Sequence, residues 1–146
     1  MAIRENDCFR LNEYGSNIRT TWQQLQIDKD FCDVTMVCDD GQIKTHRIIV
    51  SHSSPLLKDI LKQSPSQNSV IYLRGVKFKH LESLINFMYQ GEVTVSNEDI
   101  VNFLNVAEDL KVKGLSPEDG KRIWKIWTKF SLPIKMMSYI KIRVKN

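Results

Sequence analysis

The sequence predicts an α+β fold, in which a cluster of helices packs with a small mixed sheet. Amphipathic segments with apolar residues at helical spacing alternate with short runs of β-branched residues, and Asp39-Asp40-Gly41 joins two of these runs. The chain has 146 residues, of which 42% are hydrophobic and 26% are charged. This length and composition are typical of one globular domain with a tail, and they exclude wholesale disorder.

The first predicted elements are a short strand and an amphipathic helix. Residues 8–11 alternate apolar and polar side chains, as a strand does. Residues 12–27 are predicted to be helical, with Asn12 as the N-cap. One face of this helix is apolar, because steps of four, four and three residues separate Tyr14, Ile18, Trp22 and Leu25. Such a face can cover the domain's own core or a partner, and a core is the commoner use.

A β-hairpin is predicted next. Residues 33–38 and 42–50 are both rich in β-branched side chains, which favour strands. The Asp-Gly pair between them tolerates the positive φ angles of a tight turn, so the two runs are expected to pair.

Two helices and one strand are predicted after the hairpin. Ser54 and Pro55 suit the N-cap and the first position of a helix whose buried stripe is Leu56, Leu57, Ile60 and Leu61. The polar residues 63–69 predict a loop, and the apolar residues 70–73 predict a buried strand. The second helix covers residues 77–90 and ends at Gly91, with an inward face of Phe78, Leu81, Leu84, Ile85 and Met88.

The domain is predicted to close with one strand and two helices. Residues 93–95 form the strand, and Ser96 is expected to cap a helix with Ile100, Phe103, Leu104 and Ala107 inward. Residues 111–115 predict a short final helix, and residues 116–120 have the composition of a linker.

Charge divides the chain into a mildly acidic domain and a basic tail. Residues 1–120 carry 13 basic and 17 acidic residues, whereas residues 121–146 carry eight basic residues and no acidic one. The tail also alternates like a strand over residues 138–144. One interpretation is a segment that binds polyanions or an anionic membrane. The preferred one is a poorly ordered extension, on which neither folding nor pairing depends.

The sequence predicts no enzyme, no cofactor and no metal site. The glycines are scattered, without a phosphate-binding loop. Serines lie near His52, but no acid is positioned to orient it as a catalytic base. No zinc site matches the spacing of Cys32, Cys38, His46 and His52. The N-terminus lacks the apolar stretch of a signal peptide, so an intracellular protein without a membrane helix is expected.

Three motifs in this order resemble the BTB/POZ domain over residues 8–116. They are FxDV at the first hairpin strand, KxHRxxVS after the hairpin, and FMYxGEV at the end of the second helix. The opening FRLNEYGSN is similar to that of insect Tramtrack/longitudinals-lacking-type domains, and VAEDLKVKGL fits the ending of that subgroup. Asn12-Glu13 departs from the Trp-Asn pair of the pattern, so an aromatic anchor is missing there.

The resemblance implies a BTB/POZ fold over residues 1–116, with its core in residues 31–97, a mostly three-stranded sheet and short edge strands. It implies a homodimer whose interface holds Phe9, Leu11, Tyr14, Ile18, Trp22 and Leu25. It also implies that Asp33 and Arg47 form a charged pair at the floor of the dimer groove, whereas His46 is structural. The alternative for the pair is two strand-end charges that face water.

The implied function is a protein-interaction module of a nuclear transcription or chromatin regulator. Its partners would be itself, in a dimer or larger multimers, other BTB proteins and transcriptional cofactors. The sequence holds no DNA-binding module, so a short isoform that pairs with longer siblings is one reading. The alternative is a substrate adaptor of a cullin ubiquitin ligase, but residues 63–69 lack the hydrophobic-x-Glu motif of such adaptors.

Overall fold

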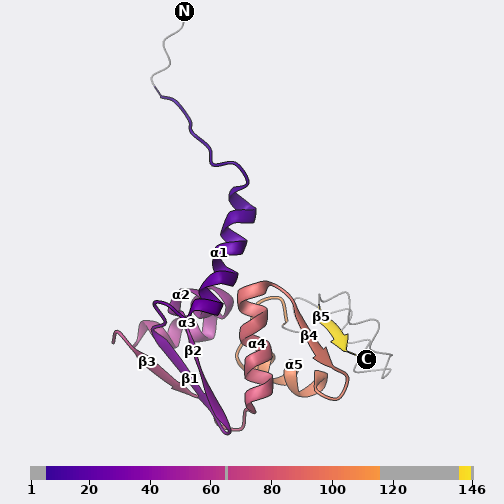
Figure 1. Cartoon of the computed structure of the whole chain (residues 1–146). Coiled ribbons are helices and arrows are strands. Elements are labelled where there is room, and N and C mark those ends of the chain that lie inside the picture. The colour runs from indigo at the N-terminus through magenta and orange to yellow at the C-terminus, as the bar shows by residue number, and fades with distance from the viewer. Residues whose placement is uncertain (1–5, 65, 116–141, 146) are drawn as a thin grey trace, which may run out of the picture.

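The computed structural model describes residues 6–64, 66–115 and 142–145. Its helices are α1 (Tyr14–Asp28), α2 (Arg47–Ser53), α3 (Pro55–Lys62), α4 (Phe78–Gln90) and α5 (Ile100–Asp109). Its strands are β1 (Val34–Cys38), β2 (Gly41–Thr45), β3 (Ser69–Tyr72), β4 (Val93–Ser96) and β5 (Ile142–Lys145). This arrangement confirms the α+β fold (Figure 1).

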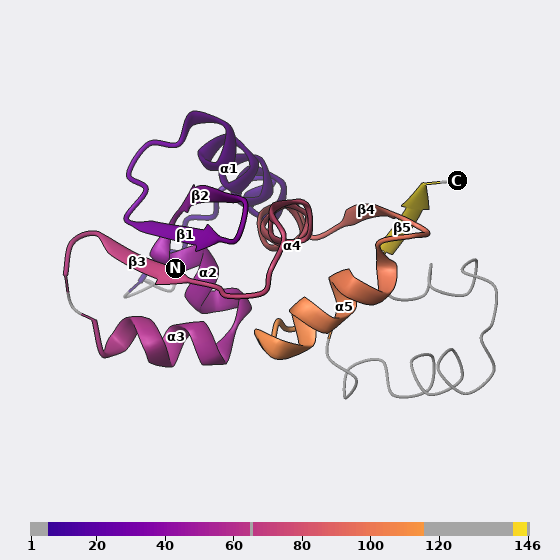
Figure 2. The ribbon, with the colours of Figure 1, turned by 90° about the horizontal axis from the view of Figure 1, so that it is seen from below.

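The helix α4 lies in the middle of the domain, between the three-stranded sheet and the pair formed by α5 and β4 (Figure 2). The sheet has the order β2-β1-β3, with β2 antiparallel and β3 parallel to β1. Burial alternates along β1, so its core-facing residues are Val34, Met36 and Cys38. As predicted, α4 ends at Gly91, which adopts a φ of 78° and donates its N–H to the Phe87 carbonyl.

The predicted hairpin is present, but Gly41 is not needed for a positive φ in the turn, because it already lies in the strand β2. Asp39 and Asp40 connect β1 to β2 without a positive φ, and Gly41 already pairs with Cys38 in the ladder. A Cβ at Gly41 would lie 2.8 Å from Cδ2 and 3.1 Å from Cγ of Phe78. Glycine is therefore required here because the aromatic ring approaches the backbone so closely.

The predicted strand 42–50 is wrong beyond Thr45, because α2 begins at Arg47. The N–H groups of Ile49 and Val50 donate to the His46 carbonyl at 3.1 and 3.2 Å, which closes the first helical turn. Both side chains are fully buried in the core. Burial of two adjacent side chains outweighs the strand preference of β-branched residues, which is weak and depends on context.

Ser54 caps α3 as predicted. Its Oγ accepts a hydrogen bond from the Leu57 N–H at 3.1 Å, and its hydroxyl donates to the carbonyl of Leu110. The buried stripe is narrower than expected, since Leu57 and Leu61 are buried whereas Ile60 is exposed.

The strand β3 lies at the edge of the sheet, and the predicted buried strand 70–73 is buried on one face only. Ile71 packs against the core, but Val70 is 68% exposed and Tyr72 is 63% exposed. A short apolar run does not reveal which position its strand takes in the sheet order.

The region around α5 differs from the prediction at both ends of the helix. Ser96 is not the cap, because α5 starts only at Ile100, after Asp99 accepts a hydrogen bond from the Ser96 hydroxyl at 2.7 Å. Residues 111–115 form turns instead of a helix. Their apolar side chains are buried all the same, and the Lys113 N–H donates to the Ser53 carbonyl at 2.8 Å.

The predicted strand over residues 8–11 is absent from the structure. Residues 6–13 run away from the domain, and no described strand lies alongside them to supply ladder hydrogen bonds (Figure 1). The predicted N-cap is wrong as well. Glu13 occupies that position with a φ of 57° and makes no side-chain cap.

The C-terminal tail contributes one described strand. Ile142–Lys145 forms β5 and pairs in parallel with β4, from Val93 opposite Ile142 to Ser96 opposite Lys145. The predicted strand pattern over residues 138–144 is confirmed where it overlaps β5. The expectation of a tail separate from the domain is wrong for these four residues, and residues 116–141 and 146 lie outside the described part.

Gly41→Ala tests the close approach of Phe78 to the hairpin. The added methyl group must displace the ring and the Cβ of Phe78, so we expect the free energy of unfolding to fall by about 1–3 kcal/mol. Denaturant titration of both chains measures the difference. Gly15→Ala is the control, because no atom lies within 4 Å of the added Cβ and alanine suits a helix, so no loss of stability is expected. Equal stability of the Gly41→Ala variant and the parent would contradict the packing argument.

Candidate functional site

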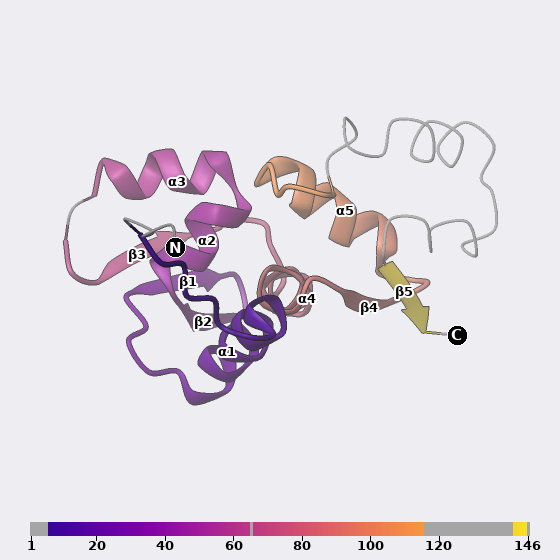
Figure 3. The same ribbon diagram turned by 90° about the horizontal axis from the view of Figure 1, so that it is seen from above.

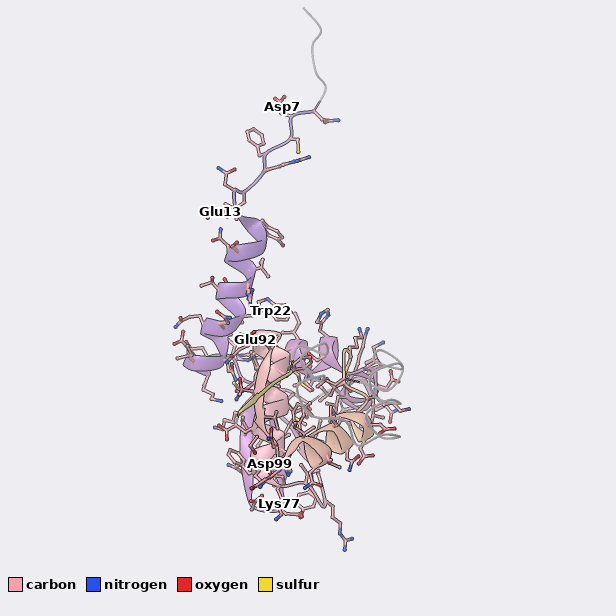
Figure 4. All side chains as sticks on the ribbon, turned by 90° about the vertical axis from the view of Figure 1, so that its right-hand side faces the viewer. Asp7, Glu13, Trp22, Lys77, Glu92 and Asp99 are labelled. Carbon is pink, nitrogen blue, oxygen red and sulfur yellow. The ribbon has the colours of Figure 1, made fainter. Side chains whose placement is uncertain are left out.

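The helix α1 has 15 residues, and none of them is buried. Its first half projects beyond the domain, and Figure 4 shows Asp7 and Glu13 far from the other elements. The predicted interface residues are therefore open to solvent along this stretch. Phe9 is 93% exposed and Leu11 is 67% exposed, while Tyr14 and Ile18 are also exposed.

The second half of α1 is anchored to the domain. Trp22 lies where α1 meets the other helices, and its ring packs edge-on against His52 at 5.8 Å between centroids (Figure 4). Gln26 donates from Nε2 to Oδ1 of Asn86 at 2.5 Å and accepts from Nε2 of Gln90 at 3.0 Å, both on α4. Trp22 and Leu25 remain half-buried. Their apolar face thus serves the domain's own core only in part.

A hollow open to solvent lies on the outer surface of α1. It is lined by Thr20, Thr21, Gln24, Leu25 and Asp28. Seen from above, α1 lies beside α4, on the side of α4 that faces away from α5 (Figure 3). The helix surface is thus concave here, with a mixed polar and apolar lining.

The structure brings Asp33 and Arg47 together, as the resemblance implied. Arg47 Nε lies 3.7 Å from Asp33 Oδ2, and Asp33 Oδ1 accepts the backbone N–H of Arg47 at 2.6 Å. The side chains are 29% and 38% exposed for Arg47 and Asp33 respectively, so the ion pair alone contributes at most about 1 kcal/mol. The Asp33 carboxylate has a second role. It accepts the backbone N–H of Arg47, which has no partner within the first turn of α2.

Arg47 also organises the loop between α3 and β3. Its Nη1 donates to the carbonyls of Leu61 and Ser64 at 3.3 Å each. Its Nη2 donates to the Ser66 carbonyl at 2.9 Å and to Ser69 Oγ at 2.7 Å. Sequence reasoning missed this second task, because carbonyl acceptors leave no signature in side-chain identity.

His46 is held in a structural network. Its backbone N–H donates to the Tyr89 hydroxyl at 2.9 Å, its Nδ1 lies 2.6 Å from that hydroxyl, and its Nε2 contacts the Asp30 carbonyl. Burial raises the pKa of Tyr89 to about 12, so the phenol stays protonated. The Cys32 thiol lies 3.7 Å from Nε2, but burial raises its pKa, which disfavours a reactive thiolate.

The described residues hold no group of three His, Cys, Asp or Glu side chains that could bind a metal ion. Within the same part of the chain, no helix is both long and apolar enough to span a bilayer.

Comparison with known sequences assigns the chain to a family. The family model for the BTB/POZ domain matches residues 22–121. Longitudinals lacking protein-like of Drosophila melanogaster is 40% identical over 124 residues, which are 84% of this chain and 98% of that protein. Broad-complex core protein isoforms 1/2/3/4/5 of the same species are 39% identical over 121 residues, and Transcription activator GAGA is 32% identical over 120 residues. The matches cover 83% and 81% of this chain, but it spans only 17% and 21% of these two relatives.

Solved structures agree on the fold. The BTB domain of zebrafish PATZ1 superposes with a TM-score of 0.67 at 12% identity, over 82% of this chain and 99% of that chain. The BTB domain of human gigaxonin gives 0.65 at 16% identity, over 82% and 98% of the two chains. The insect type of the resemblance is confirmed by the Drosophila relatives. The chain belongs to the BTB/POZ domain family.

Proposed function

We propose that this chain is an oligomerisation module that pairs with a second copy through α1 and serves nuclear regulators of transcription. The observation that carries the proposal is a 15-residue helix without a single buried residue. A helix of this length is marginal in water without tertiary packing. Its own domain supports only the second half, so a partner is needed to cover the first.

The exposed side chains favour a copy of the same chain as that partner. Tyr14 and Ile18 continue the apolar face that is anchored to the domain at Trp22. Full burial of a side chain such as Ile stabilises by about 1.5–3 kcal/mol, so covering the exposed half of this face favours pairing. Phe9 and Leu11 extend the apolar surface beyond the helix.

The relatives support a role in gene regulation. One of them is named a transcription activator, although this chain spans only 21% of it, so that activity belongs to a longer protein. Another relative is spanned over 98% of its length, so a relative of about this length occurs as well. Nuclear localisation follows from the proposed role.

The Asp33–Arg47 pair is proposed to lie at the floor of the groove between the two copies. A charge near an apolar interface is costly unless it is paired, and loss of one partner leaves the other uncompensated. The pair's contacts within the chain mean that its loss also affects the fold.

Ile18→Glu tests the pairing surface. It places a charge at an exposed position on the projecting half of α1, so we expect loss of the dimer or, for an obligate dimer, loss of folding with it. Light scattering and circular dichroism at matched concentrations measure both quantities. Ser16→Glu adds the same charge to the exposed opposite side of α1 and should leave the dimer mass unchanged. A parent chain that is a folded monomer at micromolar concentration would refute the proposal.

Arg47→Lys separates the two tasks of the charged pair. Lysine keeps the charge but not the fork that reaches four acceptors, so we expect the free energy of unfolding to fall by about 1–3 kcal/mol with partner binding retained. Asp33→Asn combined with Arg47→Gln should weaken partner binding as well, measured by calorimetry where both variants remain folded. Normal binding by the folded double variant would exclude the groove role.

A further inference from the structure

We propose that Ser66 is a phosphorylation site and that the Arg47 guanidinium binds the phosphate. A protein kinase would transfer the γ-phosphoryl group of ATP to Ser66 Oγ. The new bond joins phosphorus to Oγ, the bond from the γ-phosphorus to the bridging oxygen of ATP breaks, and ADP and the hydroxyl proton leave. The inference goes beyond the proposed dimer and does not depend on it, because it concerns the loop between α3 and β3 instead of α1.

Ser66 lies where a kinase can reach it. Together with Gln67 and Asn68 it forms an exposed run of residues that belongs to no helix or strand. A kinase needs access to the hydroxyl and to the backbone on either side, and irregular surface loops offer both. The Ser66 hydroxyl donates to the Asn68 carbonyl at 3.1 Å, an exposed contact that phosphorylation would give up at little cost.

Arg47 holds its positive charge next to the position that the phosphate would take. Its Nη2 donates to the Ser66 carbonyl at 2.9 Å and to Ser69 Oγ at 2.7 Å. Ser69 Oγ in turn lies 3.5 Å from Ser66 Oγ. A phosphate extends beyond Oγ, so its oxygens reach the place at Nη2 that the Ser69 hydroxyl now occupies. A bond between a guanidinium and a phosphate is roughly twice as strong as a bond between neutral groups, so the exchange is favourable.

The guanidinium can bind the phosphate and keep its contact with Asp33. Arg47 Nε faces Asp33 Oδ2 at 3.7 Å, whereas both Nη atoms face the loop. Lys62, in the last turn of α3, brings a second positive charge near Ser66 in the sequence. Phosphorylation adds a charge of about −1.5 to −2, which these two cations oppose. The loop would then be tied to α2 by an ionic bond instead of neutral hydrogen bonds.

Ser64, in the same loop, is the poorer acceptor. It is half-buried, and its N–H donates to the Leu61 carbonyl at 3.2 Å, at the C-terminal end of α3. A phosphate there would meet the carbonyl groups at the end of the helix, where the helix dipole disfavours an anion. The structure therefore distinguishes two serines that are only two positions apart.

Mass spectrometry of the full chain, purified from insect cells, tests the modification. We expect phosphate on Ser66 and none at this position in the Ser66→Ala variant. Ser64→Ala is the matched control and should keep the phosphate on Ser66. Phosphate on Ser64 alone, or on neither serine, would overturn the proposal.

Phosphorus NMR of the full chain with phosphoserine incorporated at position 66 tests the role of Arg47. The second pKa of a phosphoserine is about 6, and a bound guanidinium favours the dianion, so we expect a value of about 5. Arg47→Gln should return this pKa to about 6. Arg47→Lys keeps the charge without the fork, so its value should fall between the two. Arg19→Gln removes an exposed guanidinium on α1 and should leave the value at about 5.

Circular dichroism verifies the folding of each variant, and Arg47→Lys replaces Arg47→Gln if the latter does not fold. A second pKa of about 6 in the folded parent would overturn the phosphate-binding role. A lowered value that neither change at Arg47 alters would also overturn it, and would point to Lys62 as the cation. Failure of the α1 proposal is distinguishable, because it changes the mass of the assembly and neither of these two readings.

Discussion

The fold depends on the burial of α4 on several sides at once. This helix contacts α1, α2, α5, β2 and β4, and it buries His80, Leu81, Leu84, Ile85, Met88 and Tyr89. Each large apolar side chain removed from water contributes about 1.5–3 kcal/mol, so α4 supplies a large share of the core, beside the buried face of α5. The sheet and the C-terminal helix are separate layers that α4 holds together. Tyr89 also connects α4 to the start of α2, because its hydroxyl accepts the backbone N–H of His46 and contacts the imidazole ring of that residue.

The helices α4 and α1 differ in how much of their apolar face the rest of the chain covers. Both helices are amphipathic, and both have apolar residues at helical spacing. The face of α4 meets packed side chains along its length, whereas α1 meets the domain only near Trp22, Leu25 and Gln26. Amphipathicity alone therefore does not distinguish a core helix from an interface helix. The decisive fact is how much of the apolar face the same chain can cover.

Elements whose residues carry their own local signals could be predicted from the sequence. Ser54-Pro55 marks the start of α3, and Gly91 ends α4 where expected. Predictions failed where long-range contacts decide the structure. Ile49 and Val50 are helical because both side chains are buried in the core, and Val70 is exposed because it lies on the open face of its strand. Asp33 and Arg47 were paired through the family resemblance, but the contacts of Arg47 with carbonyl groups follow only from the folded loop.

The chain order of α1 and α4 has a consequence for synthesis on the ribosome. The helix that anchors α1 begins at Phe78, about 50 residues after α1 ends at Asp28. At roughly 5–20 residues per second, α1 emerges several seconds before its own domain can hold it. During that interval its apolar face has neither intramolecular support nor a completed sister domain, so nascent chains on the same messenger RNA are the nearest candidates to meet it. The proposed pairing through α1 would thus begin during translation, and it would favour chains from one polysome over chains made elsewhere in the cell.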